Sequence, residues 1–322
     1  MPCTFILSPQ AHHPNNLHAF GFTKCQMLAN ADFRVAFVLV YLSKSPLFAS
    51  ILPSTFNSLL FLARATRMLT SAIFIGLAAA ACATAHPTNP EAESRQQTGL
   101  ATVYSSCKVK GDVALTFDDG PWVYLNQISD TLKAAGAVGT FFFNGNNYGC
   151  IYDAEDRKRV KYAYAQGHMI GSHTWAHKDL KTLTYDQIHD EMWRVEQALQ
   201  RIIGVTPAFM RPPYGNYNNL VRQVASTRNQ SLVIWDFDSG DSVGASVAES
   251  ETRYNGVVSK HPETLLALNH ETYNTTAHQV LPYAISKLQG AGYRLVSLAT
   301  CLGLPAYHSI GTPATPDSTW KC

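Results

Sequence analysis

The stretch Val113-Ala-Leu-Thr-Phe-Asp-Asp-Gly-Pro121 holds the unit from which this chain is built, a short apolar run followed by acidic residues and a turn. The run over 113–117 predicts a buried β-strand. Asp118 and Asp119 follow it directly, and two adjacent carboxylates are costly unless a cation or hydrogen bonds offset their repulsion. The same letters also suit an ordinary turn or helix cap, so the rest of the sequence has to decide.

The alternation of strand and helix continues along the chain. Further strands are expected at 139–143, 168–171, 207–211, 232–237, 264–269 and 293–297. Helices are expected at 124–135, 156–166, 185–203, 218–227, 247–260 and 278–291. This pattern predicts a parallel sheet with helices outside it, and about seven strands favour a barrel-like closure. No G-x-G-x-x-G follows the first strand, which argues against a dinucleotide-binding fold. We expect one domain over residues 103–304.

Polar motifs follow the predicted strands, where parallel barrels place their chemistry. His173 and His177 come after the third strand, and their i, i+4 spacing suggests one helical turn with both rings able to reach one ion. Together with one carboxylate they would leave an open position for water, as catalytic zinc sites do. Isolated pairs of this kind are mostly surface residues, so the pair gains meaning only from its neighbours.

Two later strand ends add acid–base candidates. Arg211-Pro-Pro-Tyr214-Gly215 is a stiff loop whose Arg can keep Asp118 ionised and whose backbone N–H can face an oxyanion. His270 ends another strand, and a nearby carboxylate such as Asp238 would orient it as a general acid. Taken singly, each also fits a solvated surface position.

The joint order of these motifs is far more specific. The series TFDDG, HxxxH, RPPYG, DSxD and LxH resembles the polysaccharide deacetylases, that is, the NodB-homology domain of carbohydrate esterase family four. The resemblance spans roughly residues 104–304 and implies a distorted (β/α) barrel of seven or eight parallel strands. It implies that Asp118 is the base, that Asp119, His173 and His177 hold the metal, and that His270 is the acid.

The resemblance also implies supporting roles. Arg211 would hold Asp118, the backbone N–H of Tyr214 would help bind the oxyanion, and Asp238 would tune His270. One position departs from the family pattern, because Ser242 stands where a substrate-lining Trp is usual. This leaves the substrate preference open. Trp122, Tyr148 and Tyr217 are alternative stacking platforms, although packing explains each of them equally well.

The N-terminal region predicts export. Residues 68–85 have the short apolar core and the Ala83-Thr84-Ala85 ending of a signal peptide, with cleavage before His86. We interpret residues 1–67 as an unstructured segment or an extension of the gene model, and residues 86–102 as a polar linker. A signal-anchor over 59–85 and a buried Ala-rich helix are the alternatives.

Cysteine usage agrees with an oxidising compartment. Cleavage would remove three of the 7 cysteines and leave an even set, Cys107, Cys150, Cys301 and Cys322. Spacing alone permits three pairings. The resemblance to fungal chitin deacetylases implies Cys107–Cys301, which leaves Cys150–Cys322 to tie down the tail over 305–322. Asn229 and Asn274 begin glycosylation sequons.

These features together predict a secreted hydrolase that uses one divalent ion, Zn²⁺ or alternatively Co²⁺ or Ni²⁺, to remove N-acetyl groups from chitin or chito-oligosaccharides. The net charge of +2 gives no reason to expect a nucleic-acid partner. After signal cleavage we expect a monomer without a membrane span. The alternatives are an acetylxylan esterase, a peptidoglycan deacetylase, or a non-catalytic carbohydrate-binding module of the same fold.

Overall fold

The computed structural model describes residues 99–322, and the fold below refers to them alone. The predicted extension over 1–67, the signal peptide over 68–85 and most of the linker over 86–102 lie outside this range. The described strands are β1 (Val103–Tyr104), β2 (Asp112–Gly120), β3 (Thr140–Phe143), β4 (Met169–Ser172), β5 (Val205–Pro207), β6 (Phe209–Met210), β7 (Ser231–Val233), β8 (Phe237–Asp238), β9 (Leu265–His270), β10 (Arg294–Leu295) and β11 (Tyr307–Ile310).

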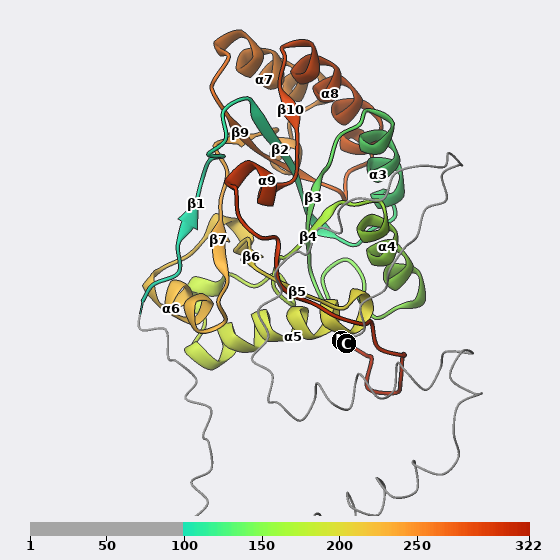
Figure 1. The fold of residues 1–322 in the computed structure, drawn as a ribbon, viewed down its shortest axis with the longest axis vertical. Coiled ribbons are helices and arrows are strands. Elements are labelled where there is room, and N and C mark those ends of the chain that lie inside the picture. The colour runs from blue at the N-terminus through green and yellow to red at the C-terminus, as the bar shows by residue number, and fades with distance from the viewer. Residues whose placement is uncertain (1–98) are drawn as a thin grey trace, which may run out of the picture. The chain divides into compact units, whose positions relative to one another are not determined.

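One parallel sheet organises these strands. Its order is β1-β7-β6-β4-β3-β2-β9-β8, and β10 adds to the start of β2. Every paired neighbour in this sheet runs parallel. The sheet curls as a half-barrel (Figure 1). β1 and β8 are the two ends of its strand order. The predicted α/β fold, a distorted barrel with seven or eight parallel strands, is therefore confirmed, and β10 adds a ninth strand to the eight along the order.

Helices surround the sheet, as Figure 1 shows. They are α3 (Leu125–Ala134), α4 (Ala154–Ala165), α5 (Tyr185–Ile203), α6 (Asn219–Thr227), α7 (Val247–Lys260), α8 (Leu281–Gly290) and the short α9 (Leu298–Leu302). The range of α5 agrees with the prediction because its signals are local. Thr184 and Gln187 form a capping box at its start, and Gly204 ends it in the left-handed conformation with φ 77°. The apolar stripe of α5 faces the core.

The core lies between the sheet and these helices. β2 is buried except at Asp119, which is half-buried, and its neighbours β3 and β9 are buried along their whole length. Phe117 and Phe141 stack across the β2–β3 pair with ring centroids 5.3 Å apart. Burying a side chain of this size stabilises the fold by roughly 1.5–3 kcal/mol. The strand that carries Asp118 and Asp119 is thus held between two buried strands.

Two disulfides confirm the implied pairing, Cys107–Cys301 and Cys150–Cys322. The tail also contains a strand. Its residues 307–310 form β11, which pairs antiparallel with β5. Trp320 then packs against Tyr152, with ring centroids 5.4 Å apart. The disulfide that was expected to hold the tail is present, and β11 is an additional element that we did not predict.

The surface features of the described range complete the fold. Across residues 99–322, no helix combines the length and the apolar character needed to cross a membrane. Asn229 and Asn274 both lie at exposed positions. Glycan attachment at these two residues stays a prediction.

Candidate active site

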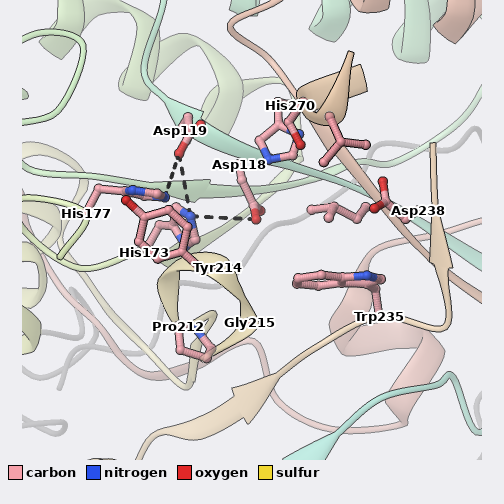
Figure 2. Close-up of a pocket in the computed structure, with 13 residues that line it drawn as sticks. Asp118, Asp119, His173, His177, Pro212, Tyr214, Gly215, Trp235, Asp238 and His270 are labelled. Atoms are coloured by element: carbon pink, nitrogen blue, oxygen red, sulfur yellow. Dashed lines mark ion pairs between the residues drawn. The ribbon is translucent and has the colours of Figure 1, made fainter. Parts of the chain in front are cut away.

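A cavity of about 380 Å³ opens at the carboxyl ends of the central strands. Its lining includes Asp118 and Asp119 from β2, His173 and His177 from the segment after β4, and His270 from the end of β9. Figure 2 shows the aspartate–histidine group at one end, Trp235 and Asp238 at the other, and Asp118 and His270 between them. Parallel strands deliver all of these side chains to one edge of the sheet.

Three of the predicted ligands lie close together. One ligand atom from each of Asp119, His173 and His177 can be chosen so that all three lie within 4.8 Å of one another. Oδ1 of Asp119 is 3.6 Å from Nε2 of His173 and 3.3 Å from Nε2 of His177 (Figure 2). The prediction that these residues converge is therefore correct, although its helical reasoning was wrong. The segment 173–177 is not a helix, and Thr174 and His177 have φ of 70° and 52°.

A hydrogen bond to the backbone orients His173 so that it can bind a cation. Its Nδ1–H donates to the carbonyl oxygen of Arg211 at 2.8 Å, which leaves Nε2 free on the side of Asp119. Burial is the largest cause of the lowered pKa of His173, and it also lowers the pKa of His177. Both imidazoles are thereby kept neutral, the form that binds metals. Two imidazole nitrogens and a carboxylate form the donor set of a catalytic zinc site with an open position.

Asp118 lies in a different environment from its neighbour in sequence. Its Oδ1 accepts a hydrogen bond of 2.8 Å from Nη1 of Arg211, which is completely buried. Arg211 is itself held by the Thr116 hydroxyl at 2.6 Å and by the carbonyl oxygen of Ile234 at 3.1 Å. Burial alone would raise the pKa of Asp118, but the charges of Arg211, His173 and His270 outweigh it and lower that pKa. Asp118 is thus ionised and oriented, as predicted for a base.

The carboxylate that contacts His270 is Asp241, which corrects our assignment of Asp238. Oδ1 of Asp241 accepts from Nδ1 of His270 at 2.8 Å, and its Oδ2 accepts from the backbone N–H of His270 at 2.7 Å. Oδ1 of Asp238 instead accepts from the N–H of Gly240 at 2.7 Å. Gly240 has φ 82°, so the chain turns sharply there and brings Asp241 back beneath β9.

Asp241 also sets the protonation of His270. Burial, the largest single effect, lowers the pKa of His270, but the hydrogen bond and charge of Asp241 together with Asp118 and Asp119 raise it to about 9. The imidazole is therefore protonated near neutral pH, as a general acid must be. Asp238 and Asp241 are the two carboxylates of the DSxD motif, and only the fold shows which of them contacts His270.

The cavity wall contains one aromatic side chain that the sequence did not single out, Trp235. Ser242 lines the cavity at the position where an aromatic residue was expected. Tyr214 is 64% exposed, and its ring lies 4.8 Å from that of His177. The three proposed stacking platforms lie outside this lining, although the rings of Trp122 and Tyr148 contact each other at 5.4 Å.

Comparison with known proteins agrees with this geometry. The family model described as polysaccharide deacetylase matches residues 105–232. A chitin deacetylase from Pestalotiopsis sp is 34% identical over 233 residues, covering 70% of this chain and 76% of that protein. A chitin deacetylase from Colletotrichum lindemuthianum is 33% identical over 236 residues, covering 70% of this chain and 93% of its own length.

Solved structures show the same relationship. The chitin deacetylase of Colletotrichum lindemuthianum superposes with a TM-score of 0.62 at 29% identity, covering 66% of this chain and 98% of that one. A peptidoglycan N-acetylglucosamine deacetylase, Bc1960, superposes with a TM-score of 0.58 at 29% identity, covering 65% and 96%. The resemblance drawn from the five motifs is thereby confirmed, and the chain belongs to the polysaccharide deacetylase family of hydrolases.

Proposed function

We propose that this protein is a secreted, metal-dependent deacetylase that hydrolyses the N-acetyl groups of chitin or chito-oligosaccharides. The observation that carries the proposal is the placement of a candidate base, Asp118, and a candidate acid, His270, beside the three candidate metal ligands. Asp118 and His270 are direct partners in the β2–β9 register, and Asp119 is the next residue along β2. Neighbouring strands lie about 4.8 Å apart, so all three groups can act on one acetamide.

Asp119, His173 and His177 would hold the cation, because their ligand atoms converge and His173 is oriented for it. We assign Zn²⁺ from the mixture of imidazole and carboxylate donors, and Co²⁺ and Ni²⁺ accept the same set. When bound, the ion polarises the acetyl carbonyl and makes water more acidic.

Asp118 then acts as the general base. Arg211 occupies its Oδ1 at 2.8 Å, which leaves Oδ2 to accept a proton from the attacking water. The water oxygen bonds to the acetyl carbon, and the former carbonyl oxygen gains negative charge. We assign the backbone N–H of Tyr214, at the cavity wall, as a donor to that oxyanion.

His270 completes the reaction as the general acid. Asp241 accepts its Nδ1–H, so Nε2–H is the proton that passes to the leaving nitrogen as the C–N bond breaks. The products are acetate and a free amine. Exchange with solvent returns the proton from Asp118 and restores the proton on His270.

The substrate assignment rests on the relatives and on the predicted export. Two relatives that this chain resembles over 70% of its length are chitin deacetylases. A peptidoglycan-N-acetylglucosamine deacetylase of Bacillus cereus is also similar, at 32% identity over 203 residues, covering 62% of this chain and 70% of that protein. The predicted signal peptide and the two disulfides support action outside the cell.

Acetate release tests the proposal directly. The purified secreted protein is incubated with chito-oligosaccharides, acetylated xylan and peptidoglycan, with a chelator and after zinc is added back. We expect the fastest release from chito-oligosaccharides, its loss with chelator and its return with zinc. Preference for xylan would indicate an esterase, and preference for peptidoglycan would indicate the bacterial-wall substrate. No release from any of the three would favour a non-catalytic carbohydrate-binding module, and release that ignores the chelator would contradict the metal role.

A further inference from the structure

Glu271 is a buried acid beside the site, and the mechanism above does not use it. It follows His270 directly and is completely buried. Its backbone N–H donates to the carbonyl oxygen of Asp118 at 3.2 Å. Its Oε1 accepts from the backbone N–H of Trp122 at 2.7 Å. Glu271 therefore holds the chain on both sides of Asp119, once before it and once after it.

The carboxyl group of Glu271 also fills the space above Gly120. A Cβ built on Gly120 would lie 2.0 Å from Oε1 of Glu271 and 2.1 Å from its Cδ. No side chain fits at such distances, so the glycine is required for this packing. The three contacts of Glu271 thus cover the whole turn from Asp118 to Trp122.

The turn needs such support because Asp119 has a strained backbone. Its φ is 75°, in the left-handed region that residues other than glycine seldom adopt. The β2–β3 register shifts at the same place, between Asp118 and Gly120. Strained conformations persist only where the surroundings enforce them. This conformation aims the Asp119 carboxylate away from its neighbour Asp118 and toward His173 and His177 (Figure 2).

We propose that Glu271 is a positioning residue for the metal ligand Asp119: its buried carboxyl clamps the Asp118–Trp122 turn and so sets the metal affinity of the site. The inference rests on the proposed metal site but not on the identity of the substrate. The contact that matters is a hydrogen-bond acceptor at Oε1, not a negative charge. Burial, above all, raises the pKa of Glu271 well above its usual value, so glutamine is a close replacement for the neutral acid.

The test measures zinc affinity by competition with a chelator, on metal-free protein whose fold is checked by circular dichroism. Glu271→Gln keeps an acceptor at the same reach, and we expect its affinity to stay within about threefold of the unaltered protein. Glu271→Ala removes the acceptor, and we expect a loss of about 10–100-fold, the usual effect of removing support behind a ligand. Glu271→Asp keeps the acid but shortens the side chain, so the carboxyl no longer reaches the N–H of Trp122. We expect it to lose zinc affinity as the alanine variant does, and it replaces that variant in the test if Glu271→Ala does not fold.

A matched control separates positioning from general stability. Glu196 is also a buried acid, 5% exposed, and it pairs with Arg228 away from the cavity. Glu196→Ala should lower the melting temperature and leave zinc affinity unchanged. Unchanged zinc affinity in Glu271→Ala, or equal losses in Glu271→Gln and Glu271→Ala, would overturn the inference. Failure of the unaltered protein to bind zinc would instead refute the proposed metal site.

Discussion

Replacing Asp241 by asparagine is the sharpest test of the acid in this site. The 2.8 Å contact with Asp241 is the main reason why the pKa of His270 reaches about 9 rather than 6.5. The difference corresponds to about 3 kcal/mol between the two protonation states. Asparagine keeps an acceptor for Nδ1–H but removes the charge. Burial then dominates, and the pKa of His270 should fall to its ordinary value or below it.

The direction of the pH shift follows from the role of His270 as an acid. A general acid works only while it is protonated, so the alkaline limb of the kcat/KM profile reports its pKa. We expect this limb to move to lower pH by about 2.5 units or more in Asp241→Asn, from about 9 to the ordinary histidine value or below it. Activity at pH 8 should fall by about 30-fold, because only a few per cent of the imidazole then carries its proton. The loss should be much smaller near pH 6.

The assay is acetate release from a chito-oligosaccharide across pH, with zinc saturating. Asp238→Asn provides the matched control, since Asp238 lines the same cavity but hydrogen-bonds Gly240 instead of His270. Its alkaline limb should coincide with that of the unaltered protein. The reasoning fails if Asp241→Asn leaves the limb in place, and our correction fails if Asp238→Asn moves it instead.

Three further changes test other parts of the molecule. Asp118→Asn should lower kcat by about 10²–10⁴-fold with zinc affinity within about threefold, because the base is lost and the ligands remain; full activity would show that another group takes the proton. His177→Ala should weaken zinc binding by more than about 100-fold in chelator competition, whereas His308→Ala, at an exposed position of β11, should not change it. Cys322→Ser removes the Cys150–Cys322 bond and should cost about 2–4 kcal/mol of stability, on the order of 10 °C in melting temperature by scanning calorimetry. An unchanged melting temperature would show that β11 and Trp320 hold the tail without the disulfide.

Local signals explain which elements the sequence predicted well. The ranges predicted for α5 and α7 match the structure, because each has its own apolar spacing and a capping box at its start. β11 was missed because its partner β5 lies about one hundred residues earlier, and strand pairing at such a separation leaves little trace in a short segment. The strand predicted over 293–297 is shorter in the structure, where only Arg294 and Leu295 pair with β2 as β10. The pairing with a distant strand, which sets the ends of β10, cannot be read from its own residues.

The site shows where motif reasoning stops. Residue identity and order were enough to select Asp119, His173 and His177, but the rings converge through a loop with two left-handed residues instead of a helical turn. The family resemblance led us to assign Asp238, the first carboxylate of the DSxD motif, as the partner of His270. The turn at Gly240 reverses that choice, and a turn's direction depends on backbone angles that a spacing pattern does not contain.

The adjacent carboxylates of the opening stretch show how one strand end supplies two different functions. Arg211 compensates the charge of Asp118, so that the pKa of Asp118 is lowered despite complete burial. Within residues 99–322, Asp119 pairs with His173 and His177 and with no Arg or Lys, and burial is the largest cause of its raised pKa. An acid in that state is stabilised by a cation more than by solvent, whereas its neighbour is already satisfied. The left-handed backbone at Asp119 separates the two carboxylates into these environments, and that explains how adjacent residues of one type can serve as base and as ligand.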